Sequence, residues 1–489
     1  MSRKAGSGAK IVPARLTGCC AAPCFISAAV GDAWVEIALT TLADPDRANL
    51  HGVSGGQQRF HSTLSELVAS PFLNFGSGPV DYSARATGPT STRQVVSFGL
   101  RLIRFDGQTI AVLQRSANPQ FGRNTAVLEI MAAAPETVTA FLAHLRGLMI
   151  EHSVLRGQVL SFVQTEYGAG AGITFLERPV VPAADIVLPE HILGTITDHV
   201  IGIGAQREVL LAAGQHLKRG VLLYGLPGTG KTLTVRHLLS ETPGMTAVLL
   251  TGSSIVHIAA AAEIARTYAP SIEVLEDIDL VAMQRNATPQ PLLFEVLDAL
   301  DGLDGDADVA FVMTNNRVEV LERALAESPG RVDLAVEVPL PALAERERLF
   351  RRYAGSLPFS PAALDAAALR SEGVTGSFAK ELIRRAVLRA ALRGDTVDDR
   401  DLQAALDDLL SAGEALTRRL LGTSSGESPR WQPDEEPTDG PNGGSYHPMH
   451  DPVAVVTRQF ASSGWATDSA APLSAAPTPE PSADSPEPV

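Results

Sequence analysis

The stretch that decides the fold is GVLLYGLPGTGKT, residues 220–232. Its apolar start predicts a buried strand, and the glycines after it lead into a helical stretch. Glycines let successive backbone amides turn inward around phosphate groups, and the N-terminus of the next helix adds partial positive charge. Lys231 is expected to reach the β and γ phosphates of a nucleotide, and Thr232 to hold Mg²⁺. The predicted nucleotide-binding residues are Gly225, Leu226, Pro227, Gly228, Thr229, Gly230, Lys231, Thr232 and Leu233.

Polar side chains close the next two apolar runs. SIEVLEDID ends in acids that include Glu276 and Asp277, and ADVAFVMTNN ends in Asn316. Ligands bind at the carboxyl ends of parallel strands, so we expect these side chains at the same sheet edge as the phosphate loop. A neighbouring strand of this kind supplies a magnesium ligand, here Glu276 with Thr232, and a carboxylate that orients water, here Asp277.

Glu273 interrupts the first of these runs. An unpaired carboxylate inside a core is costly, so we expect this residue at an edge or at a position that reaches solvent.

The surrounding pattern predicts two subdomains. Strands and helices alternate over residues 186–341, which is typical of an α/β domain with a parallel sheet. Residues 342–421 hold four helical stretches, with a capping box predicted at Thr396 and Asp399 and an N-cap at Ser360 before a proline. These stretches are ALAERERLFRRYAG, SPAALDAAALRSEG, TGSFAKELIRRAVLRAALRG and TVDDRDLQAALDDLL.

Residues 91–185 predict a small α+β domain. VVSFGLRLIRFDGQTIAVLQR alternates through two strands joined by Asp106 and Gly107, a strong hairpin signal. The strand TAVLEIMA, an amphipathic helix in APETVTAFLAHLRGLMIEHS, and the strands GQVLSFVQ and GITFLERPV follow. None of these segments contains a motif that indicates a particular chemistry.

The two ends differ in composition from the middle. Residues 1–90 carry scattered Gly, Ser and Pro with one possible helix, DAWVEIALTTLA, and we expect a poorly ordered extension. The first 31 residues fit a targeting segment or a disordered leader. Residues 422–489 are proline-rich and acidic, which predicts a disordered tail, with Trp431 and Trp465 as candidates for partner docking.

Composition narrows the function classes. A net charge of −15 over 489 residues argues against a broad nucleic-acid footprint, so nucleic acid is not an expected partner. No apolar run reaches the length of a membrane span. All three cysteines lie near the N-terminus, so the rest of the chain has no disulfide framework or zinc-ligand set, and we expect a reducing, cytoplasmic location.

Together, GLPGTGKT, PSIEVLEDID, TNNRVEVLERALAESPGRVDLAVEVPLP and the four helices resemble the AAA ATPases over residues 186–421. The resemblance implies an α/β fold: a P-loop AAA ATPase parallel sheet with a helical lid subdomain, preceded here by a small α+β N-terminal domain. It also implies ATP and Mg²⁺ as cofactors and a homo-hexamer with ATP at subunit interfaces. Asn316 would position the attacking water, and Arg331 would be an arginine finger. Glu276, Asp277, Asn316 and Arg331 are thus the predicted catalytic residues.

Several positions depart from the family pattern. The family usually has Asp-Glu where this chain has Glu276 and Asp277, an order that resembles the mitochondrial AAA chaperone that translocates the Rieske protein. Ser328 stands where many relatives have a further arginine. TGSSIVHIAAAAEIARTYAPS lacks the aromatic pore loop with which threading relatives grip a polypeptide.

Two functional readings follow. The first is an ATP-hydrolysing machine that remodels or disassembles protein clients. The alternative is an ATP-gated scaffold or switch that assembles on nucleotide binding and threads no substrate, which the missing pore aromatic favours. A nucleic-acid-directed AAA protein is a third reading, and the acidic balance weakens it.

Overall fold

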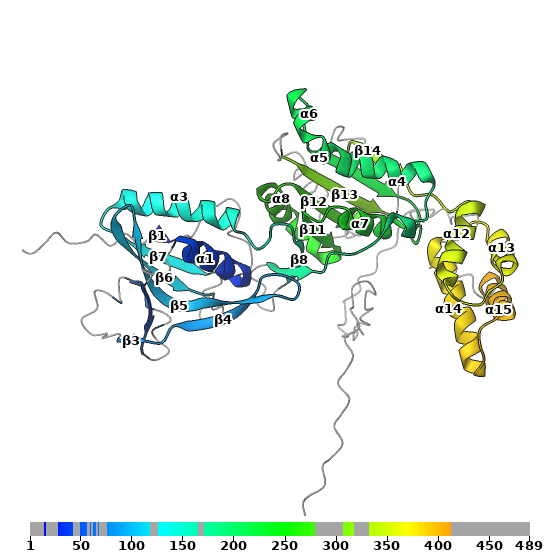
Figure 1. Ribbon diagram of the computed structural model, residues 1–489, viewed down its shortest axis with the longest axis horizontal. Coiled ribbons are helices and arrows are strands. Elements are labelled where there is room, and N and C mark those ends of the chain that lie inside the picture. The colour runs from blue at the N-terminus through cyan, green and yellow to red at the C-terminus, as the bar shows by residue number, and fades with distance from the viewer. Residues whose placement is uncertain are drawn as a thin grey trace, which may run out of the picture. The chain divides into compact units, whose positions relative to one another are not determined.

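The computed structural model describes residues 14–15, 28–42, 49–55, 59, 62–64, 67, 76–117, 126–164, 171–278, 307–316 and 332–411. All of the described residues belong to one compact unit within residues 1–428. Two seven-stranded sheets and a group of helices make up this unit (Figure 1). None of the described helices is both long enough and apolar enough to cross a membrane.

The second sheet carries the phosphate loop, and its strand order is β14-β10-β13-β12-β11-β8-β9. The five strands from β14 to β11 are parallel, as the alternation of strands and helices predicts. They read as continuous apolar runs because helices cover both faces of a parallel sheet. The bounds are β10 Arg219–Tyr224, β11 Thr246–Thr251, β12 Ser271–Glu276, β13 Val309–Asn315 and β14 Leu334–Glu337.

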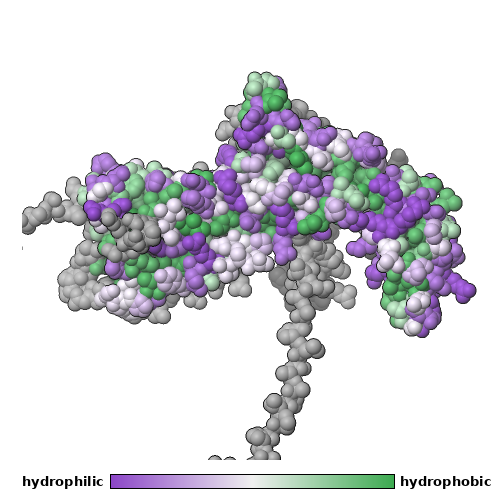
Figure 2. All heavy atoms as spheres, in the orientation of Figure 1, coloured by the Kyte–Doolittle hydropathy of each residue, from purple (hydrophilic) through white to green (hydrophobic). Residues whose placement is uncertain are grey.

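Helices supply the side chains that cover this sheet. On one face, α4 (Glu190–Thr197) and α7 (Lys231–Ser240) pack with Leu223 and Val274. On the other, α8 (Ile258–Thr267) packs with Leu275. The shorter elements are η3 Ala183–Asp185, η4 Asp198–Gly202, α5 Ile203–Ala205, α6 Arg207–Ala212 and η5 Gly252–His257. Figure 2 shows hydrophobic side chains at the end of α6, where Val209 is 65% exposed.

Two strands differ from the sequence-based division at residue 185. β8 (Val159–Gln164) pairs with β11 in parallel, and β9 (Ala171–Leu176) pairs with β8 antiparallel, so both belong to the second sheet. Their apolar patterns predicted strands correctly. A strand pattern does not identify the partner strand, however, so sequence alone groups β8 and β9 with the domain that precedes them.

Residues 343–410 fold into the four predicted helices around one core that includes Phe350 and Phe378. Ser360 caps its helix as predicted, accepting a hydrogen bond from the Ala363 amide at 3.1 Å. The predicted capping box at Thr396 and Asp399 is wrong, because Asp398 and Asp401 form it instead. The bounds are α12 Leu343–Ala354, α13 Pro361–Arg370, α14 Gly376–Arg393 and α15 Asp399–Leu410.

The first sheet has the order β1-β7-β6-β5-β2-β3, with β4 also paired to β5. The predicted hairpin forms: β5 and β6 meet at Asp106 (φ 47°) and Gly107 (φ 75°), the left-handed pair that Asp-Gly favours. α3 packs against one face through Phe141 and Leu145. The bounds are β1 Ala14–Arg15, β2 Asn49–Val53, β3 Ser77–Gly78, β4 Asp81–Ala86, β5 Thr92–Phe105, β6 Gln108–Arg115, β7 Val127–Met131 and α3 Pro135–Glu151.

Part of residues 1–90 belongs to this sheet, contrary to the expected poorly ordered extension. The predicted helix is α1 (Ala28–Leu42), and its Val35 and Leu39 pack beside α3. β2 and β4 add to the edge of β5. Short strands flanked by Gly and Pro lack a long hydrophobic period, which explains why the sequence pattern missed them. The predicted tail at 422–489 lies outside the described residues.

Candidate functional site

The phosphate loop joins β10 to α7. Gly225 has φ 144°, and a side chain there would place its Cβ 2.4 Å from the Val338 carbonyl oxygen, so only glycine fits. Lys231 opens α7, is 5% exposed, and donates from Nζ to the carbonyl oxygens of Gly225 at 2.8 Å and Leu226 at 3.0 Å. The ammonium is therefore held at the loop, where a phosphate would replace carbonyl partners.

Glu276 is the last residue of β12 and is 9% exposed. Burial raises the pKa of its carboxyl, and the charge of Asp277 raises that pKa further, whereas a hydrogen bond with the Thr232 side chain and the charge of Arg236 lower it. The structure thus joins Thr232 and Glu276, which the sequence placed together only by motif. Hydroxyl and carboxylate oxygens are ligands that Mg²⁺ accepts alongside nucleotide phosphates.

Asp277 follows β12 in a left-handed conformation, with φ 54°. Its backbone amide donates to Thr314 Oγ1 at 3.0 Å, and Asn316 Nδ2 donates to its Oδ1 at 2.7 Å. Asp tolerates this backbone region better than most residues because its short side chain is compatible with it. Thr314 therefore holds the backbone of Asp277, and Asn316, just after β13, orients its carboxylate.

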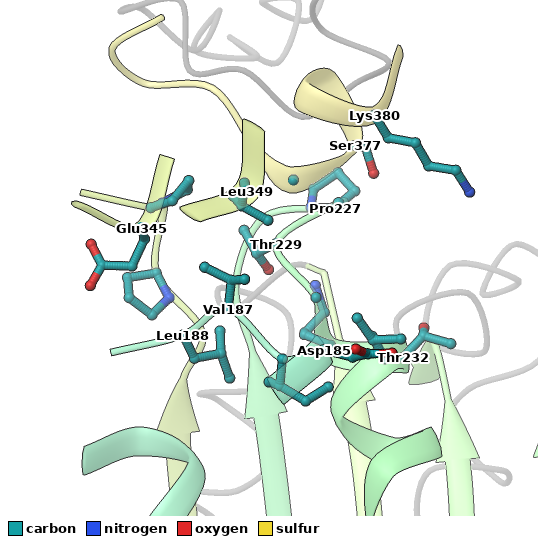
Figure 3. A pocket seen from close by; sticks show the side chains of 18 of the residues that line it. Asp185, Val187, Leu188, Pro227, Thr229, Thr232, Glu345, Leu349, Ser377 and Lys380 are labelled. Atoms are coloured by element: carbon teal, nitrogen blue, oxygen red, sulfur yellow. The ribbon is translucent and has the colours of Figure 1, made fainter. Parts of the chain in front are cut away.

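Lys231, Thr232, Asp277 and Asn316 line a cavity of about 440 Å³, and Glu276 is not among its lining residues. Figure 3 looks into it: Thr229 and Thr232 come from the loop and α7, Val187 and Leu188 from the segment before α4, and Ser377 from α14. Its lining combines residues 185–189, Pro227, Gly228, Thr229, Gly230, Lys231, Thr232, Leu233, Arg236, Asp277, Asn316, Pro339, Pro341, Glu345, Leu349, Tyr353, Gly376, Ser377 and Lys380.

The helical lid, which comprises α12 to α15, contacts the phosphate loop directly. The amide of Ser377 donates to the Gly228 carbonyl oxygen at 3.3 Å. A Cβ on Gly228, which has φ 83°, would lie 2.7 Å from Ser377 Oγ and 3.0 Å from Thr375 Oγ1. Glycine at 228 is thus required both by its φ and by the close approach of α14.

Sequence reasoning missed part of this lining. The segment 185–189, Tyr353 and Lys380 were not predicted, because each lies far in sequence from the phosphate loop and matches no motif. Lys380 lies in the second turn of α14, and no sequence signal marks it. Arg331 and Ser328 lie outside the described residues.

The expectation for Glu273 is wrong. β12 lies between β11 and β13, and Glu273 is 0% exposed, opposite Val248 and Phe311 in the two neighbouring strands. Neither carboxyl oxygen has a hydrogen-bond partner among the described residues. Burial raises the pKa of Glu273 well above its ordinary value, so the group is a neutral acid inside the core.

The connection after β11 is short. η5 (Gly252–His257) runs directly into α8, which begins at Ile258, without an intervening loop. The Thr251 amide donates to Ser254 Oγ at 2.8 Å as part of a capping box that starts η5. No separate loop therefore lies between η5 and α8.

Comparison with known proteins agrees with this geometry. The sequence profile of the family described as "ATPase family associated with various cellular activities (AAA)" matches residues 221–340. Residues 221–340 are thus similar in sequence to the AAA ATPase domain. The matched residues run from β10 past β14 and hold the phosphate loop, Asp277 and Asn316. The predicted fold class is confirmed, and the match over residues 221–340 supports the prediction of a P-loop ATP hydrolase.

Curated relatives share this AAA domain. The chain is 29% identical over 269 residues to the ATP-dependent zinc metalloprotease FtsH 3 of Sphaerobacter thermophilus, covering 52% of this chain and 54% of the relative. It is 33% identical over 190 residues to the 26S proteasome regulatory subunit 6B homolog of Saccharomyces cerevisiae (35% and 44%). It is 31% identical over 214 residues to proteasome-activating nucleotidase 1 of Halobacterium salinarum (39% and 51%). The chain thus spans about half the length of these relatives.

Proposed function

We propose that this protein binds ATP with Mg²⁺ in the cavity between the phosphate loop and the lid, hydrolyses it, and uses the energy to remodel or disassemble protein clients. The observation that carries the proposal is the convergence of Lys231, Asp277 and Asn316, from three separate strand ends, on one cavity beneath the lid. Hydrolysis of a phosphoanhydride needs positioning and charge stabilisation more than covalent chemistry, and this set offers both.

Each residue has a proposed role. Lys231 and the loop amides bind the β and γ phosphates, and Thr232 and Glu276 would hold Mg²⁺, which neutralises charge on the phosphates. Asp277 accepts a proton from the attacking water or orients it, and Asn316 positions that water. The 2.7 Å contact between Asn316 and Asp277 supports this assignment, because it places the two groups within reach of a shared water.

Client remodelling is supported by the relatives, whose names describe ATP-dependent proteolysis and proteasome activation. The alternative, an ATP-gated scaffold or switch that threads no substrate, has its own support in the direct passage of η5 into α8. The Glu-Asp order, which resembles the mitochondrial Rieske-translocating chaperone, is compatible with either reading. The proposal also includes a homo-hexamer, an arginine finger at Arg331 and a cytoplasmic location.

The first test measures Mg²⁺-dependent ATP turnover with and without an unfolded protein. We expect turnover in the wild type and its loss, together with weaker ATP binding, in Lys231→Ala. Acceleration by the unfolded protein supports remodelling, and a rate that no unfolded or tagged protein changes supports the switch. A wild type that neither binds nor hydrolyses ATP contradicts both readings.

A second test identifies the client. Asp277→Asn is expected to keep ATP and lose turnover, so an affinity-tagged form should hold its client while bound to ATP. The same capture with Lys231→Ala is the control, since a subunit that does not bind ATP should not retain the client. Equal recovery from the two variants would show that capture does not depend on nucleotide.

A further inference from the structure

Trp34 connects the two sheets of the described unit. It lies on α1, whose Val35, Ala38 and Leu39 pack with α3 against the first sheet. Trp34 itself belongs to the core on the α8 face of the second sheet, where it is 1% exposed. Its ring meets that of Tyr268 edge-on, with the ring centres 6.2 Å apart. Successive residues of a helix point about 100° apart, so this one helix contributes to two cores.

The opposite side of α1 is fixed to the first sheet by a buried ion pair. Glu36 lies two residues after Trp34, about 200° around the helix. It is 8% exposed, and its carboxylate accepts from Arg101 of β5 at 2.5 Å and from the Val96 amide of the same strand at 3.3 Å. Breaking a buried pair leaves an uncompensated charge, which is strongly destabilising. Whatever holds Trp34 therefore holds the first sheet as well.

Tyr268, the partner of Trp34, is anchored to the segment that connects α3 with β8. Ser153 of this segment forms a hydrogen bond with the Tyr268 side chain. The Arg156 guanidinium lies 5.8 Å from the centre of the Tyr268 ring, and its Nη1 donates to the Ala269 carbonyl oxygen at 3.4 Å. The Tyr268 carbonyl oxygen accepts from Thr246 Oγ1 at 3.1 Å. Two separate stretches of the chain, α1 and the connector, thus meet at one residue of the second sheet's core.

Packing holds the Trp34 ring in this core. Its Nε1 has no hydrogen-bond partner among the described residues, although a buried indole N–H usually has one. A phenylalanine at this position would lose no hydrogen bond and would keep an aromatic ring against Tyr268. An alanine would leave a cavity. The two substitutions therefore separate the contribution of the ring from every other property of the position.

We propose that α1 is a rigid joint, through which the first and second sheets move as one body during the ATP cycle. The joint lies outside the nucleotide cavity, because Tyr268 precedes β12 by three residues and Glu276 is at the far end of that strand, about 17 Å away. A client held by the first sheet would thus be displaced together with the second sheet. That movement rests on the proposed function, since ATP turnover drives it, whereas the joint itself needs no nucleotide.

The test measures the distance between the two sheets by electron spin resonance on a pair of spin labels. One label is placed at Thr109 on β6 and the other at Glu241 directly after α7, both exposed positions. Cys19, Cys20 and Cys24 are replaced by serine, so that only the two introduced cysteines are labelled. We expect one narrow distance distribution without nucleotide, and the same distribution with ATP and with ADP.

Trp34→Ala should broaden this distribution and lower the melting temperature on the order of 5–10 °C, because a large ring is lost from a core. Trp34→Phe should keep the distribution narrow. Leu392→Ala is the matched control, since Leu392 is a large apolar residue of α14 that is 80% exposed. Circular dichroism of each variant checks that it is folded.

Two results would overturn the joint: a broad or nucleotide-dependent distribution in the parent, or a narrow one in folded Trp34→Ala. The parent comparison needs no variant, so it decides the question even where Trp34→Ala does not fold. Both results leave the proposed function standing, because ATP binding and turnover are measured separately on the same proteins. A parent that binds no ATP would overturn the proposed function, while a narrow nucleotide-free distribution would still support the joint.

Discussion

The ends of β10 and β12 face the same cavity but are built on different principles. After β10, the backbone is the recognition element: glycines at 225 and 228 have positive φ and no room for a Cβ. After β12, the side chains are the recognition element, and their direction depends on a left-handed Asp277 held by Thr314 and Asn316. A site formed by the backbone can be predicted from its glycine motif. A site formed by side chains depends on contacts with distant residues, which the sequence does not show.

The largest expected effect tests whether the ends of β10 and β12 are sufficient for ATP hydrolysis within one subunit. Arg331→Ala should keep ATP and lower turnover on the order of 10³- to 10⁵-fold, because an arginine finger carries transition-state charge. If it acts across a subunit interface, specific activity should rise with protein concentration, and mixing Arg331→Ala with Lys231→Ala subunits should restore part of the rate. Concentration-independent activity together with an unimpaired Arg331→Ala enzyme would mean that one subunit holds a complete site.

A smaller but still large effect is expected at the end of β12 alone. Asp277→Asn keeps the size, tolerates the left-handed φ and still accepts a hydrogen bond from Asn316, but it cannot take a proton. Turnover should fall on the order of 10²- to 10⁴-fold with ATP affinity retained. Steady-state turnover and equilibrium binding of ATP check this, and normal hydrolysis by Asp277→Asn would assign water activation to another group.

Exchanging Glu276 and Asp277 tests whether the backbone conformation or the side-chain length limits turnover. Glu276→Asp with Asp277→Glu restores the order common in the family, but it puts Glu at φ 54°. A residue without the local compatibility of Asp loses about 1–2 kcal/mol in this region. We expect turnover to fall by about tenfold. Glu276→Asp alone is the matched control, and a double variant faster than the wild type would show that the backbone is not the constraint.

Glu273 tests the middle of β12, and the measured quantity is the free energy of unfolding. Its ordinary pKa of 4.5 applies in the unfolded chain, and burial raises the pKa in the folded chain. Between those two values the unfolded state loses a proton that the folded state keeps, so stability falls as pH rises, by about 1.4 kcal/mol per unit. Glu273→Gln should remove this slope. Denaturant unfolding of both proteins from pH 4 upward measures it, and parallel curves would contradict a neutral buried acid.

The sequence predicted the regular parts of this molecule well. The phosphate loop, the four lid helices and the Asp106–Gly107 hairpin each follow from a local pattern, and the structure contains them. It predicted poorly whatever depends on distant partners: the sheet to which β8 belongs, the burial of Glu273, and the entry of Lys380 into the cavity. Periodicity tells which face of an element is apolar, but it does not tell which element will cover that face.

The pairing of β8 with β11 has a consequence for dissecting the chain. A fragment that begins at residue 186 contains the whole AAA match but lacks β8 and β9, so the edge of β11 would present unpaired amides and carbonyls. It would also lose Leu160 and Phe162, which pack in the same core as α8. Exposed edges of apolar strands pair with other chains, so such a fragment should aggregate. A fragment that begins near residue 153 keeps the edge closed, so the natural cutting point precedes the family boundary by two strands.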